Sequence, residues 1–180
     1  MSKMGRGLRQ FMSSFHWKQI PTSKNWIKKT RNLLRKDDSI DVWIDSRGKK
    51  GDRITGVHRK FIKSQLKNIS DITGIEIGTK VKYKNADIQI FSQKDYKGRG
   101  YKYLKKKRRF SLNFHSNFDD FDEFDKVIVT SGLLYPFGLK DIPMKDDYWV
   151  MSSTSVMGCC LSTYEGITPL DTRALQNIWL

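Results

Sequence analysis

The chain has 180 residues, 38% of them apolar and 12% aromatic, which is enough to bury the core of one domain. No apolar run approaches the roughly 18 residues that a membrane-spanning helix needs. The formal net charge of +15 favours a polyanionic partner, such as a nucleic acid, an anionic membrane surface or an acidic protein. A surface that is charged only for solubility would give the same balance.

The positive charge is concentrated in two segments. Residues 1–36 contain ten Lys or Arg and no acid, and residues 94–109 contain nine more with only Asp95 against them. The two cysteines, Cys159 and Cys160, are neighbours, so a bond between them would join no distant parts of the chain. We therefore expect free thiols, with a reactive or metal-binding pair as the alternative.

The N-terminal part is predicted to be a basic tail over residues 1–37. Residues 1–22 show little apolar periodicity and are expected to be mobile, and they lack the apolar stretch of a secretory signal, which favours an intracellular or particle-associated protein. Ser23 can cap an amphipathic helix over about 24–36. Such a helix can lie on a membrane or a partner, but docking on its own domain, predicted over 38–180, is preferred.

The next elements can be placed by their periodicity. An alternation of apolar and polar residues predicts a strand over 40–44. Thr55 can cap a long helix over 56–73, which Gly74 ends, and His58 within it is expected to be a surface or packing residue. The residues expected on the apolar face of this helix are Val57, Phe61, Leu66, Ile69 and Ile72.

Further strands are predicted over 75–77, 81–83, 86–91 and 110–114. Residues 119–135 suit a helix whose first turns are acidic, where the helix dipole favours negative charge, and a last helix is predicted over about 170–178. This order of strands and helices indicates an α/β or α+β domain.

The last fifty residues carry the most informative pattern. They contain Val127-Ile-Val-Thr-Ser131-Gly-Leu-Leu-Tyr135-Pro-Phe-Gly138-Leu-Lys-Asp141, then Ser155-Val-Met157-Gly and Thr168-Pro-Leu-Asp171. This order resembles the active-site helix, Met-turn and terminal helix of the metzincin metallopeptidases, whose helix carries H-E-x-x-H-x-x-G-x-x-H/D. Thr73-Gly-Ile-Glu-Ile77 and Ala86-Asp-Ile are similar to phrases of the matrixin–serralysin branch, so the resemblance covers roughly residues 38–180.

The resemblance implies a metzincin-like zinc-protease domain. Its expected parts are a twisted mixed sheet, a long helix, an active-site-like helix, a Met-turn at Met157 and a C-terminal helix. Residues 110–114 would be the edge strand above the cleft, and His115 would border that cleft.

The zinc motif itself is degenerate. Alignment on Gly138 places Ser131 and Tyr135 at the two helix histidines and Gly132 at the glutamate, which leaves Asp141 as the one candidate ligand. A serine hydroxyl is a poor zinc donor, a tyrosine must first lose a proton with a pKa near 10, and a glycine supplies no base. We therefore expect no catalytic residue and no cofactor, with zinc bound only if the motif is misread. Tyr135 is predicted to fill the place of the metal and to point towards Asp141 or Ser131.

Three functions remain open. The first is a peptidase-like domain that has lost zinc and hydrolysis and binds an extended peptide or protein in its cleft, as a binding or assembly module. The second is a residually or unconventionally active peptidase, in which Ser131 would serve as nucleophile with a base near it. The third is a nucleic-acid or anionic-surface binder, although the same basic loop would also protect an edge strand from aggregation. The candidate polyanion-binding residues are Lys102, Lys105, Lys106, Lys107, Arg108 and Arg109.

Overall fold

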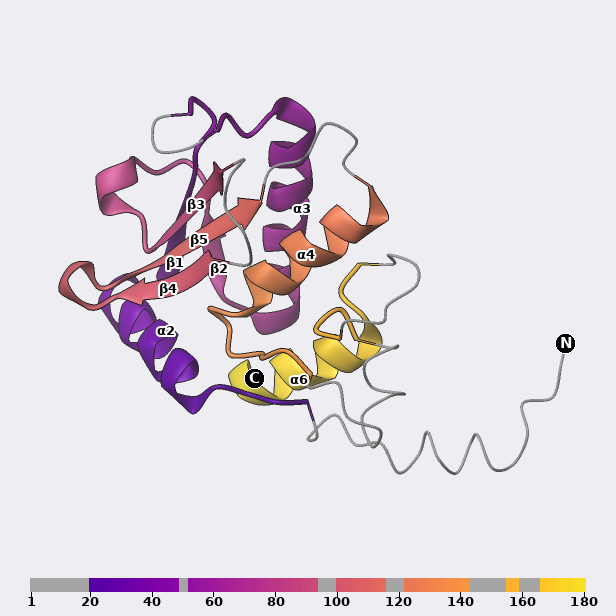
Figure 1. The fold of residues 1–180 in the computed structure, drawn as a ribbon. Helices are drawn as coiled ribbons and strands as arrows, with labels where there is room; N and C mark the ends of the chain where they lie inside the picture. Colours follow the sequence, from indigo (N-terminus) through magenta and orange to yellow (C-terminus); the bar gives the residue numbers. More distant parts are fainter. Residues whose placement is uncertain (1–19, 49–51, 94–99, 116–121, 143–154, 159–165) are drawn as a thin grey trace, which may run out of the picture.

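The computed structural model describes residues 20–48, 52–93, 100–115, 122–142, 155–158 and 166–180 (Figure 1). Its five strands form one sheet in the order β2-β1-β3-β5-β4. All neighbouring pairs are parallel except β4 and β5, which are antiparallel. Four α-helices are described beside this sheet, so the predicted mixed α/β class is confirmed.

The strands owe their places to alternating apolar residues. They are β1 (Ser39–Ile44), β2 (Glu76–Gly78), β3 (Ile88–Gln93), β4 (Gly100–Leu104) and β5 (Arg109–His115). Every second residue of β1 is buried, and the register pairs Val42 with Ile88 and Ile88 with Phe110. Because side chains alternate between the faces of a sheet, these apolar residues line one continuous core.

The helices begin and end at the residues that capping chemistry favours. They are α2 (Lys24–Asp37), α3 (Gly56–Thr73), α4 (Glu123–Leu134) and α6 (Pro169–Trp179), with short 3₁₀ turns η2 (Tyr83–Asn85) and η3 (Lys105–Lys107). The Ser23 hydroxyl accepts from the Trp26 amide at 3.3 Å, and Gly74 ends α3 at a φ of 71°. The predicted helices over 24–36, 56–73 and 170–178 are thus confirmed to within one residue at each end.

Three strand expectations change in the structure. The strand predicted over 81–83 is wrong, because residues Tyr83–Asn85 form η2. The lysine-rich stretch contains the unpredicted strand β4. As a result, the strand predicted over 110–114 is present as β5 but is not the edge strand, since it lies between β3 and β4.

Two helices also differ in detail from the expectation. Helix α4 begins at Glu123 and not near 119, because the Asp122 carboxylate caps it by accepting from the Asp125 amide at 2.9 Å. Val57 was expected on the apolar face of α3 but is 67% exposed. The predicted Leu66 and Ile69 are confirmed on the buried face of α3, which also contains His58, Ile62, Gln65 and Thr73. His58 is therefore a packing residue, and its Nδ1 lies 2.5 Å from the Thr55 hydroxyl.

The segment before β1 docks on the body of the domain. Ile20 is buried, the Ser23 amide donates to the Gly138 carbonyl at 2.8 Å, and the Lys140 amide donates to the Pro21 carbonyl at 2.9 Å. The preferred docking of the 24–36 helix is confirmed, since α2 lies beside β4 (Figure 1) and the Thr30 hydroxyl donates to the Pro136 carbonyl at 2.5 Å. The prediction of a mobile tail is therefore wrong for residues 20–22. Residues 1–19 lie outside the described ranges.

Among the described helices, none is long and apolar enough to cross a membrane.

Candidate functional site

Ser131 lies on the last turns of α4 and is completely buried. Its hydroxyl donates to the Ile128 carbonyl of the same helix at 3.0 Å. A nucleophilic serine needs a base within hydrogen-bond reach and access for its substrate. The Ser131 hydroxyl is instead bonded to a backbone carbonyl of its own helix and is buried away from solvent.

Gly132 allows α4 to approach β5 closely. A Cβ atom at this position would lie 2.5 Å from Cε1 of Phe114, so any side chain there would force the Phe114 ring to shift. The glycine at the motif position of the glutamate therefore has a packing role. A glycine inside a predicted helix was the available signal for such a close approach, but the sequence alone does not name Phe114 as the neighbour.

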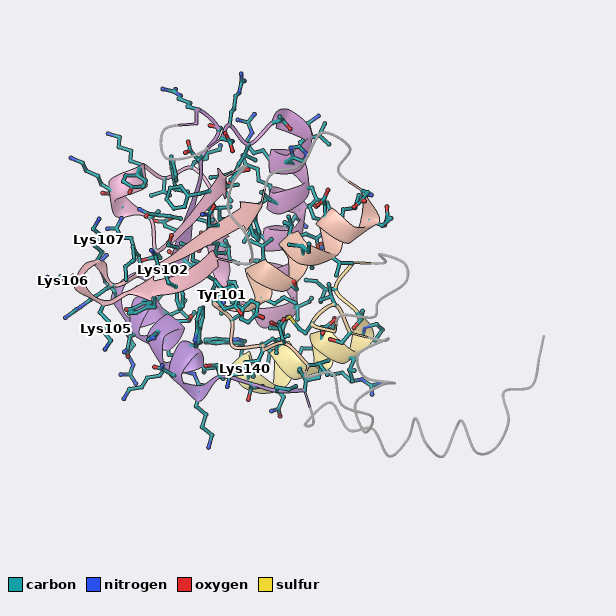
Figure 2. The ribbon with its side chains drawn as sticks, viewed as in Figure 1. Tyr101, Lys102, Lys105, Lys106, Lys107 and Lys140 are labelled. Atoms are coloured by element: carbon teal, nitrogen blue, oxygen red, sulfur yellow. The ribbon has the colours of Figure 1, made fainter. Side chains whose placement is uncertain are left out.

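Tyr135 is buried under aromatic rings that come from separate elements. Its ring stacks on Tyr101 of β4, with centroids 3.7 Å apart and an interplanar angle of 22°. Trp26 of α2 lies 6.0 Å from Tyr135 and 5.5 Å from Tyr101, and it also packs on Phe110 at 5.1 Å. We call Trp26, Tyr101, Phe110 and Tyr135 the aromatic cluster. Figure 2 labels Tyr101 on β4.

The surroundings of Tyr135 keep its hydroxyl protonated. Burial raises the pKa of Tyr135 well above its ordinary value, and the nearby Asp141 carboxylate and Tyr101 hydroxyl raise it further. Among the described residues, no partner reaches the Tyr135 hydroxyl with normal hydrogen-bond geometry, so both neighbours act on it from less favourable positions. The influence of Asp141 agrees with the prediction that Tyr135 faces this residue. A neutral tyrosine is a poor zinc ligand.

Gly138 makes the turn that leads from α4 to Asp141. Its φ of 102° lies in the region that favours glycine, and a Cβ there would collide with Ile27 of α2. Glycine at this position therefore permits both the turn and the close docking of α2. Asp141 follows on the surface of the molecule.

The segment at Met157 is held by a buried carboxylate. Asp171 of α6 is fully buried, and its two oxygens accept from the Ser155 hydroxyl at 2.5 Å and the Val156 amide at 3.0 Å. The Thr168 hydroxyl donates to the same carboxylate at 2.6 Å. Burial raises the pKa of Asp171, while the Ser155 and Thr168 hydrogen bonds oppose that shift. The sequence pattern did not assign this role to Asp171.

Met157 itself is buried next to the segment that leaves α4. It is 1% exposed, and its carbonyl accepts from the Ile142 amide at 3.1 Å. The structure thus brings Met157 and the chain after Asp141 together. In the part of the chain that is described, no three His, Cys, Asp or Glu side chains gather as a metal site would require.

Several candidate residues fall outside the description. These are Cys159, Cys160, the basic residues between 94 and 99, and the side chain of His115.

The candidate polyanion-binding residues lie on the hairpin formed by β4 and β5. Figure 2 shows Lys105, Lys106 and Lys107 at its tip, with Lys102 further along β4. We call these three tip residues the lysine tip. Arg109 differs from them, because its guanidinium donates to the backbone carbonyls of Tyr83 at 3.2 Å and Lys84 at 2.9 Å. It therefore ties the hairpin to η2.

Comparisons of the sequence with protein-family models and with curated proteins found no match.

Proposed function

We propose that this chain is a metzincin-like domain that has lost zinc binding and hydrolysis and serves as a protein-binding or assembly module. The observation that carries the proposal is the burial of Tyr135 under Tyr101 and Trp26. A catalytic zinc needs about three protein donors and an open position for water. At the place that the motif gives to the second histidine, aromatic rings from separate elements fill the space.

The order of the described elements supports the metzincin part of the proposal. A first strand, a long helix that ends at Gly74, the strands β3 and β5, the helix α4, a buried Met157 and a terminal helix follow one another in the order that the resemblance implies. The edge position differs from that order, because β4 and not β5 lies at the edge of the sheet. The hydrogen bonds of Asp171 support a structural role for the Met157 segment, because they anchor Ser155 and Val156 to α6.

The partner that we propose is an extended peptide or protein segment that adds a strand to the outer edge of β4. Among the described strands, β4 pairs only with β5, so its other edge has no strand partner. Strand addition needs backbone hydrogen bonds and side-chain pockets but no metal. The peptide cannot bind directly above Tyr135, because Trp26 occupies that space.

The proposal can be tested with the full chain purified without a chelator and without a histidine tag. Plasma mass spectrometry is expected to find no stoichiometric zinc. One zinc per chain that Asp141→Asn removes would overturn the proposal, and Asp71→Asn, which changes an exposed carboxylate on α3, is the matched control.

Binding and hydrolysis can be separated in the same preparation. The immobilised protein is incubated with a mixture of unstructured casein peptides, which are then identified by mass spectrometry. We expect a subset of extended peptides to be retained and recovered intact. Cleavage that stops on addition of a chelator would contradict the proposed loss of hydrolysis.

A second function, polyanion binding, is favoured by the lysine tip. Lys105, Lys106 and Lys107 are all exposed and project from one end of the hairpin (Figure 2). Clustered cations bind phosphate chains by releasing counterions, so such binding weakens steeply as salt rises.

A further inference from the structure

A hollow lies at the carboxyl end of β1, on a different part of the molecule from the aromatic cluster. It has a volume of about 630 Å³ and lies between the loop after β1, the first turns of α3 and the segment after β2. Its lining consists of Trp43, Ile44, Ser46, Arg47, Arg59, Lys63, Thr79, Val81, Lys82, Tyr83, Lys84 and Asn85. We call it the β1 pocket. No residue of the degenerate zinc motif lines it.

The β1 pocket is strongly and uniformly positive. Its cations are Arg47, Arg59, Lys63, Lys82 and Lys84, and no carboxylate is among the lining residues. Within the described ranges, none of these cations forms an ion pair. Like charges around one hollow repel one another, and a multiply charged anion would relieve that repulsion.

Two of these cations occupy unfavourable positions on α3. Arg59 and Lys63 are four residues apart, so they lie on the same face of the helix and repel each other. Arg59 also belongs to the first turn of α3, where the helix dipole disfavours positive charge, and this turn contains no acid. The arrangement costs helix stability, and an anion bound in the pocket would offset that cost.

The pocket also has an aromatic wall. The rings of Trp43 and Tyr83 meet edge to face, with centroids 5.0 Å apart, and Phe91 lies behind them at 5.7 Å and 6.4 Å. These contacts hold the two wall rings in place, so that a flat ligand ring can pack against them.

The location and size of the pocket are those of a small-molecule site. Open α/β sheets bind ligands outside the carboxyl ends of their parallel strands, and the pocket lies where β1 and its parallel neighbour β2 end. Its volume falls within the range of pockets that hold small ligands.

We propose that the β1 pocket binds a small organic polyphosphate that carries a planar ring, of the class of the nucleoside polyphosphates. The guanidinium groups of Arg47 and Arg59 can hold phosphate oxygens in a bidentate manner, and the lysines add point charges. The planar ring packs against Trp43 and Tyr83. This site is separate from the peptide-binding edge of β4.

Titration calorimetry on the full chain at about physiological ionic strength tests the proposal, with adenosine triphosphate and inorganic tripolyphosphate as probes. We expect adenosine triphosphate to bind one site per chain and more tightly than tripolyphosphate. Arg59→Gln combined with Lys63→Gln is expected to weaken its binding by about tenfold or more.

The matched control is Lys60→Gln combined with Lys67→Gln. It removes the same charge from exposed positions of the same helix, but neither residue lines the pocket, so we expect affinity to be unchanged. Circular dichroism verifies the fold of both double variants. If both double variants weaken adenosine triphosphate binding equally, net charge alone explains the binding, and the proposal is overturned.

Two further outcomes would overturn parts of the proposal. Equal affinity for adenosine triphosphate and tripolyphosphate would show that the planar ring does not contribute to binding, and would overturn that part of the proposal. A single-stranded oligonucleotide that binds more tightly than adenosine triphosphate and displaces it would assign the pocket to a nucleic acid. None of these results depends on zinc or on peptide binding.

Discussion

Gly132 and Tyr135, two residues at the end of α4, are fixed by their immediate neighbours. Gly132 has Phe114 against it, and Tyr135 has Tyr101 stacked on its ring. A glutamate at Gly132, the residue that the resemblance implies for an active enzyme, would push a side chain into Phe114. The close packing of α4 on β5 therefore requires glycine at this position.

Gly132→Ala is expected to lower the free energy of unfolding by about 1 kcal/mol. Overpacking against Phe114 costs about 1–3 kcal/mol, which exceeds the roughly 1 kcal/mol that alanine adds to helix stability. Urea denaturation measures the difference. Gly56→Ala is the control, because a Cβ at Gly56 meets nothing within 4 Å, and it is expected to leave stability unchanged or slightly higher.

The raised pKa of Tyr135 is expected to lower the free energy of unfolding at alkaline pH. Its pKa is raised in the folded chain, while in the unfolded chain it is near 10. Above about pH 10 the unfolded chain therefore releases this proton and the folded chain keeps it, which favours unfolding. Urea midpoints at about pH 8 and about pH 11 should fall less in Tyr135→Phe than in the original chain. Equal falls would contradict the raised pKa.

At the scale of elements, α6 holds the Met157 segment through one side chain. The Asp171 carboxylate joins the N-terminus of α6 to Ser155 and Val156, and the Ser155 hydroxyl in turn accepts from the Met157 amide at 3.0 Å. The turn that resembles a Met-turn is therefore anchored from α6.

Asp171→Asn is expected to destabilise the protein by about 1–3 kcal/mol. The substitution replaces one acceptor oxygen by an amide donor, which then faces hydroxyl or backbone donors in a buried place. Chemical denaturation measures the loss. The same substitution at Asp71, whose side chain is 62% exposed, should change stability by less than about 0.5 kcal/mol, and an equal effect at both positions would contradict the role of Asp171.

The helices were predictable because their signals are local. Ser23 and Thr168 cap helix N-termini with their hydroxyls, and α2 and α6 begin directly after them. Gly74 takes up the left-handed backbone conformation that ends α3. Strand β4 was missed because its pairing with β5 outweighs the poor strand preference of a lysine-rich segment.

The candidate site was predictable only in part. The burial of Tyr135 under Trp26 joins residues that are far apart in the chain, and no local pattern indicates such a contact. The β1 pocket was missed for the same reason, because its cations come from separate segments.

At the scale of the whole molecule, two of the basic surfaces on the described residues are connected through one side chain. Arg109 ties the hairpin that bears the lysine tip to η2, whose Tyr83 and Lys84 line the β1 pocket. The hairpin and the pocket are therefore held in a fixed relation, although they offer different chemistry.

Neutralising the lysine tip tests polyanion binding. Lys105→Gln, Lys106→Gln and Lys107→Gln together should weaken binding of a single-stranded oligonucleotide and reduce its salt slope by about 2, since each lost phosphate contact removes about 0.7. Fluorescence anisotropy over a range of salt concentrations measures both effects. Lys24→Gln, Lys28→Gln and Lys60→Gln remove the same charge elsewhere, and an equal loss in that control would contradict a specific role for the tip.

The docking of α2 has a consequence for biosynthesis. The Thr30 hydroxyl bonds to Pro136, 106 residues further along the chain, and Ser23 bonds to Gly138. A ribosome therefore releases α2 long before it makes Tyr101, Phe110 and Tyr135, whose rings pack against Trp26. During that interval the apolar face of the nascent helix is exposed, and the mutual repulsion of its lysines and arginines opposes association between neighbouring chains.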